Sequence, residues 1–337
     1  MPSTHEYRAP WWLPGGHAQT IYTSVFAPRP PVHYRRERWD TPDGDFIDLD
    51  WVEGRDSGLG IGDSKASTPV VVLFHGLEGS SNSHYARSIM QAVLARGWRG
   101  VVVHFRGCSG EANRLPRAYH SGDSTEGSWI LARLRTLAGA APLFAAGVSL
   151  GGNMLLRWLG EHGASAGRTV TACAAVSAPV DLTAAGDALA LGFNRVYTAN
   201  FLGTMKRKTL AKRERYPDLV DWARMGAANT LRLFDDVVTA PLHGFRDVDD
   251  YWTRASAKPV LGGIRVPTLM LNALNDPFLP ARALPSPQAV SPQVRLEYPP
   301  EGGHVGFTTD APPWRPHWLP HRLLTFFDEQ MTTASRN

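Results

Sequence analysis

A serine at position 149 stands in a pattern that is typical of a catalytic nucleophile. The pentapeptide Gly147-Val148-Ser149-Leu150-Gly151 follows an apolar run at 142–146 and precedes a helix-like stretch at 152–160. A strand, a sharp turn that carries serine and a helix are the context in which G-x-S-x-G forms a nucleophile elbow. Glycines flank such a serine because the neighbouring backbones come too close for a Cβ atom. These flanks disfavour a chance match in a loop, and the pattern predicts Ser149 as a nucleophile.

A general base is expected near the C-terminus. The segment Gly302-Gly303-His304-Val305-Gly306 follows a strand-like run at 294–298. A histidine on a glycine-rich loop after the last strand can take the proton from Ser149 and later return it to the leaving group. The chain has 12 histidines, but this setting singles out His304.

The acid that orients the imidazole should follow an earlier strand. Asp276 comes directly after the apolar run 266–272, at the strand end where chemistry gathers in open α/β sheets. A turn before Pro277 is the structural alternative for this residue. Asp181, which follows the strand-like run 170–176, is the rival acid. We favour Asp276 because it precedes the histidine loop in the order serine, acid, histidine.

Two backbone N–H groups are needed to stabilise an oxyanion. One should belong to Leu150, the residue after the nucleophile, and the other to the loop after an early core strand. The strand is expected at 69–74, and its loop is His75-Gly76-Leu77-Glu78-Gly79. Leu77 is therefore the second predicted donor, and His75 is expected to be a packed loop residue.

Composition limits the other classes of function. Of the 337 residues, 43% are hydrophobic and 20% charged, as in an ordinary globular enzyme, and the net charge is +4. Six cationic residues lie within 206–215: Lys206, Arg207, Lys208, Lys212, Arg213 and Arg215. A solvated helix face is the favoured interpretation of this cluster, and a surface that binds anionic lipid or nucleic acid is the alternative. The sequence has no nucleic-acid motif and no spaced metal-ligand set or phosphate loop, so no cofactor and no metal are expected.

Location is predicted from cysteines and apolar segments. Cys108 and Cys173 show no C-x-x-C spacing, so disulfides are not expected and a reducing cytoplasm is compatible. The N-terminal residues lack the pattern of a signal peptide, and no apolar run is long enough for a membrane span. We therefore expect a cytoplasmic protein.

The order of elements predicts an α/β fold with a mainly parallel central sheet flanked by helices. Strands are expected at 69–75, 100–105, 142–148, 170–177, 266–272 and 294–298. Helices are expected at 83–96, 124–138, from the elbow to about 162, and at 317–331. Residues 34–52 contain two strand-like runs around a turn at 40–44, and residues 1–33 are expected to form an irregular N-terminal arm. Residues 34–180 and 257–337 should form the core.

Residues 181–256 interrupt this alternation with helical patterns only, at 199–215, 218–236 and 247–255. An insertion between core strands is expected to cover the site as a lid that excludes water and shapes the acyl pocket. The alternative is a helical insertion that only packs. Apolar residues expected to line the substrate pocket are Phe193, Phe201, Trp222, Met225 and Leu233.

Several stretches together resemble the YheT-like branch of the α/β-hydrolases: 75–82, 105–113, 117–122, 147–153, 239–245 with 251–252, 275–278 and 302–307. The resemblance implies an α/β-hydrolase fold and a cofactor-free serine esterase or lipase-like activity. It carries the triad onto Ser149, Asp276 and His304. Two positions depart from the family's pattern. The N-terminal motif often reads Asn-Pro-His-x-Gln-Thr, and here Gly15-Gly16 stand in place of Asn-Pro, which leaves the packing of this arm open. The motif of the acid often has a second aspartate where this chain has Asn275. Many animal relatives carry an N-terminal membrane anchor.

One matching motif, at 106–109, has no obvious chemical role. For Arg106 a structural role is favoured over substrate contact, because glycine-rich loops usually encode backbone shape. Cys108 lacks an elbow and ranks below Ser149 as a nucleophile.

The leading hypothesis is a carboxylesterase that acts on small esters of short- to medium-chain acids through an acyl-enzyme on Ser149. An acyltransferase or thioesterase with the same triad is an alternative, as is a non-catalytic ligand-binding homologue. The expected partner is a small-molecule ester, with no nucleic acid and no membrane span. The sequence does not predict the oligomeric state.

Overall fold

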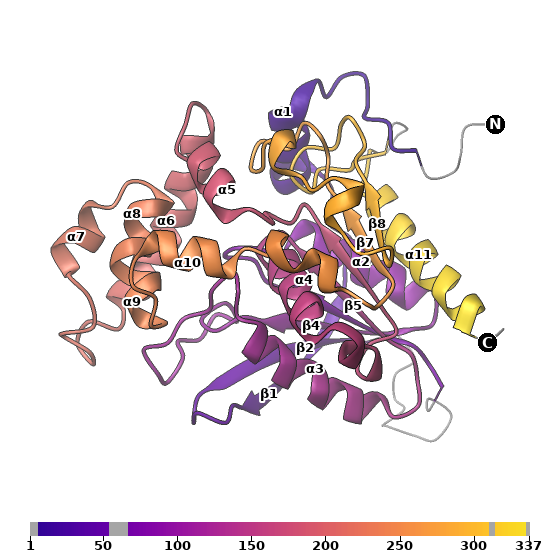
Figure 1. The fold of residues 1–337 in the computed structure, drawn as a ribbon, viewed down its shortest axis with the longest axis horizontal. Coiled ribbons are helices and arrows are strands. Elements are labelled where there is room, and N and C mark those ends of the chain that lie inside the picture. Colours follow the sequence, from indigo (N-terminus) through magenta and orange to yellow (C-terminus); the bar gives the residue numbers. More distant parts are fainter. Residues whose placement is uncertain (1–5, 54–66, 310–313, 335–337) are drawn as a thin grey trace.

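An eight-stranded sheet forms the centre of the computed structural model, which describes residues 6–53, 67–309 and 314–334 (Figure 1). The strands are β1 (His33–Asp40), β2 (Phe46–Glu53), β3 (Val70–Phe74), β4 (Arg99–His104), β5 (Leu143–Val148), β6 (Ala172–Val176), β7 (Thr268–Leu271) and β8 (Val294–Glu297). Their order is β1-β2-β4-β3-β5-β6-β7-β8. β2 runs antiparallel to β1 and β4, and all other neighbours are parallel. The prediction of a mainly parallel sheet is confirmed.

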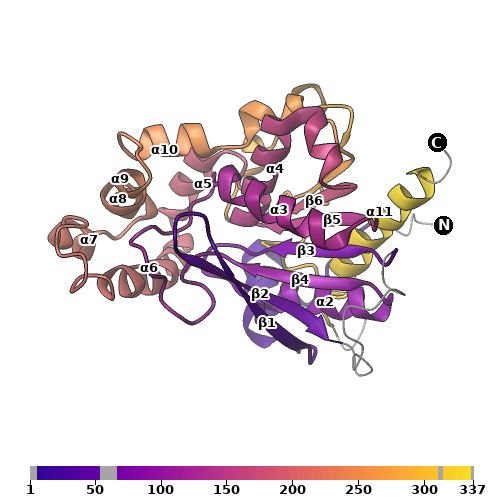
Figure 2. The same cartoon turned by 90° about the horizontal axis from the view of Figure 1, so that it is seen from below.

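The central strands are apolar along their whole length because both faces of the sheet are covered. In β3, Val70, Val72 and Phe74 join the cluster on one face, whereas Val71 and Leu73 join the cluster on the other. α3 (Ser124–Ala138) and α4 (Leu150–His162) pack on the first face, and α2 (His84–Ala95) and α11 (Trp318–Ala334) on the second (Figure 2). This two-sided core fixes the register of the strands that carry the site.

Helices from residues 182–255 form a lobe beside the carboxyl ends of the strands (Figure 1). They are α5 (Leu182–Leu189), α6 (Asn194–Leu210), α7 (Trp222–Ala227), α8 (Leu231–Phe234), the π-helical turn η4 (Asp235–Thr239), α9 (Ala240–Leu242) and α10 (Val248–Ala255). The lobe has a small core of its own, formed by Leu202, Met225, Ala228, Phe234, Val237 and Val238. The remaining segments are short 3-10 turns: η3 (Gly163–Arg168), η5 (Lys258–Gly263), η6 (Ala281–Ala283) and η7 (Pro287–Ala289).

The prediction of one helix at 218–236 is wrong. The chain forms α7 and α8 instead, and each begins at a side-chain cap. Asp221 accepts a hydrogen bond from the Arg224 N–H, and Thr230 accepts one from the Leu233 N–H. Asp and Thr compete with the helical backbone for these N–H groups, so they start new helices rather than continue an old one.

The prediction of an irregular arm is wrong for residues 15–26. α1 (Gly15–Ile21) continues into the π-helical turn η1 (Tyr22–Phe26). The prolines that suggested irregular structure lie outside this segment, at Pro10, Pro14 and Pro28. A helix can therefore form between them.

In the part of the chain that the structure describes, no helix combines the length and hydrophobicity that crossing a membrane requires.

Candidate active site

Ser149 lies on the sharp turn between β5 and α4. Its backbone has φ 52° and ψ −118°, a left-handed conformation that is costly for a residue other than glycine. The turn is held because the Ser149 N–H donates to the Val176 carbonyl oxygen at 2.8 Å. A Cβ on Gly151 would lie 2.5 Å from the Phe74 carbonyl oxygen. Only glycine allows α4 to approach β3 this closely, as the G-x-S-x-G pattern requires.

The loops after β7 and β8 bring Asp276 and His304 together. The His304 Nδ1 lies 2.9 Å from Asp276 Oδ2 and 3.2 Å from Oδ1. Asp276 is 5% exposed, and its Oδ1 also accepts a hydrogen bond from the Phe278 N–H at 2.8 Å. A carboxylate so held fixes which imidazole nitrogen carries the proton and leaves the other nitrogen free to act as a base.

Ser149 and His304 line the same cavity. Among the hydrogen bonds of the described residues, none joins the Ser149 hydroxyl to the His304 ring, and in unliganded enzymes such bonds are often long and tighten only around a substrate. Asp181, the rival acid, does not pair with His304 among the described contacts. It caps α5 by accepting from the Ala184 N–H and pairs with Lys258 at 3.5 Å.

Leu77 and Leu150 both line this cavity. Neither N–H has a hydrogen-bond acceptor within the described ranges. The next residue after Leu77 is strained, with φ 56° at Glu78, and its N–H is taken up by the Tyr119 hydroxyl at 2.8 Å. His75 is a packed loop residue as predicted, since its Nε2 accepts a hydrogen bond from the Phe105 N–H. The loop thus leaves the Leu77 N–H available to a ligand.

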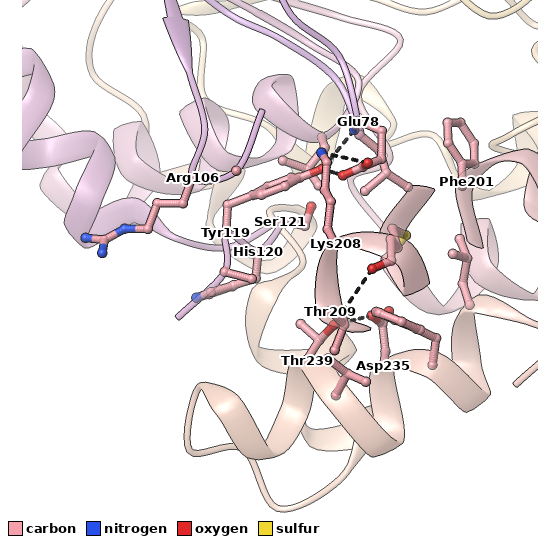
Figure 3. A pocket seen from close by; sticks show the side chains of 18 of the residues that line it. Glu78, Arg106, Tyr119, His120, Ser121, Phe201, Lys208, Thr209, Asp235 and Thr239 are labelled. Carbon is pink, nitrogen blue, oxygen red and sulfur yellow. Dashed lines mark hydrogen bonds and ion pairs between the residues drawn. The ribbon is translucent and has the colours of Figure 1, made fainter. Parts of the chain in front are cut away.

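The cavity has a volume of about 390 Å³ and extends from Ser149 into the lobe. Its apolar wall includes Leu182, Leu189, Phe201, Met205, Phe234, Val238, Trp252 and Leu279. Its polar lining includes a group around Lys208 and a group around Asp235 (Figure 3). A cavity whose surface is mainly apolar suits a ligand that carries a hydrocarbon chain.

Of the five predicted pocket residues, only Phe201 lines this cavity. The other four lie elsewhere, which corrects the sequence-based assignment. Phe193 and Leu233 are about half exposed, with 50% and 46% of their surface open to solvent. Met225 is buried in the core of the lobe, and Trp222 packs against that core. Met225 and Trp222 thus contribute to the lobe's own core. Sequence alone does not distinguish an apolar residue that packs in such a core from one that lines a pocket.

Lys208 is a residue that the sequence analysis assigned to a solvated face, yet it reaches into the cavity. Its ammonium lies 2.7 Å from Glu78 Oε2 and 3.4 Å from the Cys108 Sγ (Figure 3). Burial raises the pKa of the Cys108 thiol to about 11, so this cysteine is a protonated thiol near neutral pH. Lys208, in α6, and Lys212, just after the end of that helix, are four residues apart, and this spacing is the signal that could have separated them from their exposed neighbours.

Arg106 has a structural environment. Its guanidinium contacts Glu126 at 2.6 Å and Asp45 at 3.0 Å, and it also pairs with Asp43. In Figure 3 the guanidinium points away from the group around Lys208. The positive charge of Arg106 is thus balanced by these carboxylates of the protein itself.

In the part of the chain that the structure describes, no group of three or more His, Cys, Asp or Glu side chains has the geometry of a metal site.

Comparisons with known proteins bear on the family and the fold. A family model described as alpha/beta hydrolase fold matches residues 69–311. YheT of Escherichia coli strain K12 is 40% identical over 91% of this chain and 88% of its own, and phospholipase ABHD3 of Mus musculus is 32% identical over 90% and 74%. The solved structure of Est1E from Butyrivibrio proteoclasticus, with ferulic acid bound, covers 88% of this chain and 99% of its own at a TM-score of 0.56 and 14% identity, a likeness of fold.

Proposed function

The chain belongs to the YheT-like branch of the α/β-hydrolase family, and on that premise we propose that it is a serine carboxylic-ester hydrolase. Its curated relatives include proteins named as a phospholipase and a monoacylglycerol lipase. The observation that carries the proposal is the pair of His304 and Asp276, joined at 2.9 Å, in a cavity that Ser149 also lines. That arrangement suits acyl transfer to a serine hydroxyl.

The reaction begins when the Ser149 Oγ attacks the ester carbonyl carbon while His304 takes the hydroxyl proton. Asp276 holds the imidazole and stabilises its charged form. The negative charge on the carbonyl oxygen is stabilised by the Leu77 and Leu150 N–H groups. His304 then gives its proton to the leaving alcohol. Water, deprotonated by the same imidazole, then attacks the acyl carbon. The bond from that carbon to the Ser149 Oγ breaks, and His304 returns the proton to the Oγ, which releases the acid and restores the enzyme.

The lobe of residues 181–256 acts in this proposal as a lid over a core formed by 34–180 and 257–337. Support comes from the cavity wall, to which α5, α6, α8 and η4 contribute apolar side chains. The cavity volume of about 390 Å³ suits a short- to medium-chain acyl group. Excluding water from this space strengthens the electrostatic interactions of the reacting groups.

A series of p-nitrophenyl esters from acetate to dodecanoate tests the proposal. We expect hydrolysis without added metal or nucleotide, with the highest kcat/KM for an acyl chain of short to medium length. An inert protein, or activity that appears only with a metal ion, would contradict the proposal.

A further inference from the structure

α1 lies across the two loops that carry Asp276 and His304, although it is more than 250 residues away in sequence (Figure 1). The helix is short and partly exposed, yet two of its polar side chains are buried. Gln19 is fully buried and Thr20 is 5% exposed. Burying polar groups is costly unless they form hydrogen bonds, so the partners of these two residues are informative.

The Gln19 side chain connects the acid loop to the histidine loop. Its Oε1 accepts hydrogen bonds from the Gly302 N–H at 2.8 Å and from Asn275 Nδ2 at 3.0 Å. Its Nε2 donates to the Leu13 carbonyl oxygen and to Glu301 Oε1. One amide therefore joins the residue before Asp276 to a residue two positions before His304.

Thr20 contacts the histidine backbone directly. Its Oγ1 accepts a hydrogen bond from the His304 N–H at 2.8 Å and donates to the Gly16 carbonyl oxygen at 2.7 Å. The adjoining Gly303 N–H donates to Asn275 Oδ1 at 2.9 Å. Each backbone N–H from 302 to 304 thus has a side-chain acceptor on α1 or on the acid loop.

Close packing reinforces these hydrogen bonds. A Cβ on Gly303 would lie 2.6 Å from the Gly16 carbonyl oxygen and 2.7 Å from Thr20 Oγ1. A Cβ on Gly16 would collide with the Asn275 carbonyl oxygen. The residue after His304 is also strained, since Val305 has φ 59°. Such a conformation persists only where its surroundings hold it in place.

We infer that Gln19 and Thr20 are positioning residues of the active site, which hold the backbone of His304 so that its ring meets Asp276 and faces Ser149. The inference rests on the proposed function. It explains the Gln-Thr of the N-terminal motif, whose packing the sequence left open. The role differs from simple packing because Thr20 accepts a hydrogen bond from the backbone of the general base itself, and Gln19 accepts one from Gly302, two residues earlier.

The chain offers a matched control for Thr20. Thr23, in the adjoining turn η1, is also buried, but its Oγ1 donates only to the carbonyl oxygens of Gln19 and Thr20, four and three residues earlier. Thr20→Val and Thr23→Val therefore each remove one threonine hydroxyl from the continuous helical segment 15–26. Only the first removes an acceptor from the His304 N–H.

We expect Thr20→Val to lower kcat about 10- to 100-fold with little change in KM, since misplacing a catalytic group by about 1 Å costs rate rather than binding. Thr23→Val should stay within about twofold of the wild type, and Thr20→Ser, which keeps the acceptor, should restore most of the rate. Hydrogen exchange in a peptide covering 301–307 should accelerate in Thr20→Val and not in Thr23→Val. Thr20→Ala repeats the test if the valine variant does not fold.

Equal kcat values for Thr20→Val and Thr23→Val, with the wild type active, would overturn the inference and leave the proposed function intact. Faster exchange without a loss of kcat would also overturn it, because the contact would then be structural only. A wild-type protein that hydrolyses none of the esters would overturn the proposed function first, so the two failures are distinguishable.

Discussion

The phenyl ring of Phe278 stacks on the imidazole of His304, with ring centroids 4.0 Å apart and planes 22° from parallel. Tyr197 and Phe201 of the lobe also pack edge-on against this phenyl ring, with centroid distances of 4.9 Å and 6.0 Å. Phe278 thus joins the lobe to the imidazole of His304. Phe278 lies two residues after Asp276 in the loop after β7, and its N–H donates a hydrogen bond to Asp276 Oδ1, so one loop positions both side chains beside His304.

Phe278→Ala should lower kcat about tenfold, because the imidazole loses the ring that restricts its orientation. Phe193→Ala is the control, since Phe193 contacts Tyr197 and His17 in the same aromatic group without reaching His304. Steady-state kinetics on one ester measures both. A Phe278→Ala enzyme as fast as the Phe193→Ala enzyme would contradict this role.

Asp276→Asn should reduce kcat by about 10⁴, because the amide allows the wrong imidazole tautomer. Asp181→Asn should change kcat little. Asp181 caps α5, and asparagine caps a helix about as well as aspartate, so Asp181→Asn should also unfold much like the wild type, whereas Asp181→Ala should lose about 1 kcal/mol of stability. Kinetics and thermal unfolding of these variants separate the two roles. The reverse pattern would move the acid to the loop after β6.

Asp235 should make the protein less stable as pH rises. Burial raises the pKa of this carboxyl from 3.8 to about 6, against the effect of its hydrogen bonds from Thr239 and Trp252. The folded state therefore binds the proton more tightly than the unfolded state. The free energy of unfolding should fall by up to about 3 kcal/mol as pH rises from about 4 to about 6, and level off above that range.

Denaturant unfolding across this pH range, with Asp235→Asn and Asp236→Asn, measures the effect. The first variant should lose this pH-dependent component, because its amide cannot ionise. Asp236, which pairs with Arg224 at the surface of the lobe, serves as the control. An unchanged pH profile in Asp235→Asn would show that this carboxyl is not the source.

Phe201→Ala should shift the preferred acyl chain toward greater length, because removing a phenyl ring from the cavity wall enlarges the cavity. One methylene in such a pocket is worth about 1–3 kcal/mol in discrimination. Leu233→Ala, at a half-exposed position outside the cavity, should leave the preference unchanged. The ester series applied to both variants checks this. An equal chain-length profile for the two would place the acyl group elsewhere.

The sequence predicted those parts of the site that depend on local pattern. The elbow at Ser149 can be recognised because strand, turn and helix are adjacent in the chain. Asp276 and His304 follow apolar runs, and the carboxyl ends of parallel strands meet at one edge of a sheet. The same logic gave the core strands, whose apolar runs reflect burial on both faces.

Features that depend on distant contacts could not be predicted in this way. The hydrogen bond from the His304 N–H to Thr20 spans 284 residues, and no periodicity encodes it. In the lobe, α6 shows no clear apolar face, because it contacts the core, the cavity and solvent on different sides. Its cavity residues, Phe201, Met205 and Lys208, thus look like their exposed neighbours, and Trp222 and Met225 look like pocket residues although they pack within the lobe.

The most direct test of the account is covalent labelling of Ser149. The wild-type protein, incubated with a fluorophosphonate, should lose its esterase activity and gain one adduct, which peptide mass spectrometry should locate on Ser149. Ser149→Ala should fold normally, take up no label and retain about one part in 10⁶ of the wild-type kcat. A label on another residue, or a Ser149→Ala protein that keeps a tenth of the wild-type turnover, would contradict the central claim that Ser149 is the nucleophile.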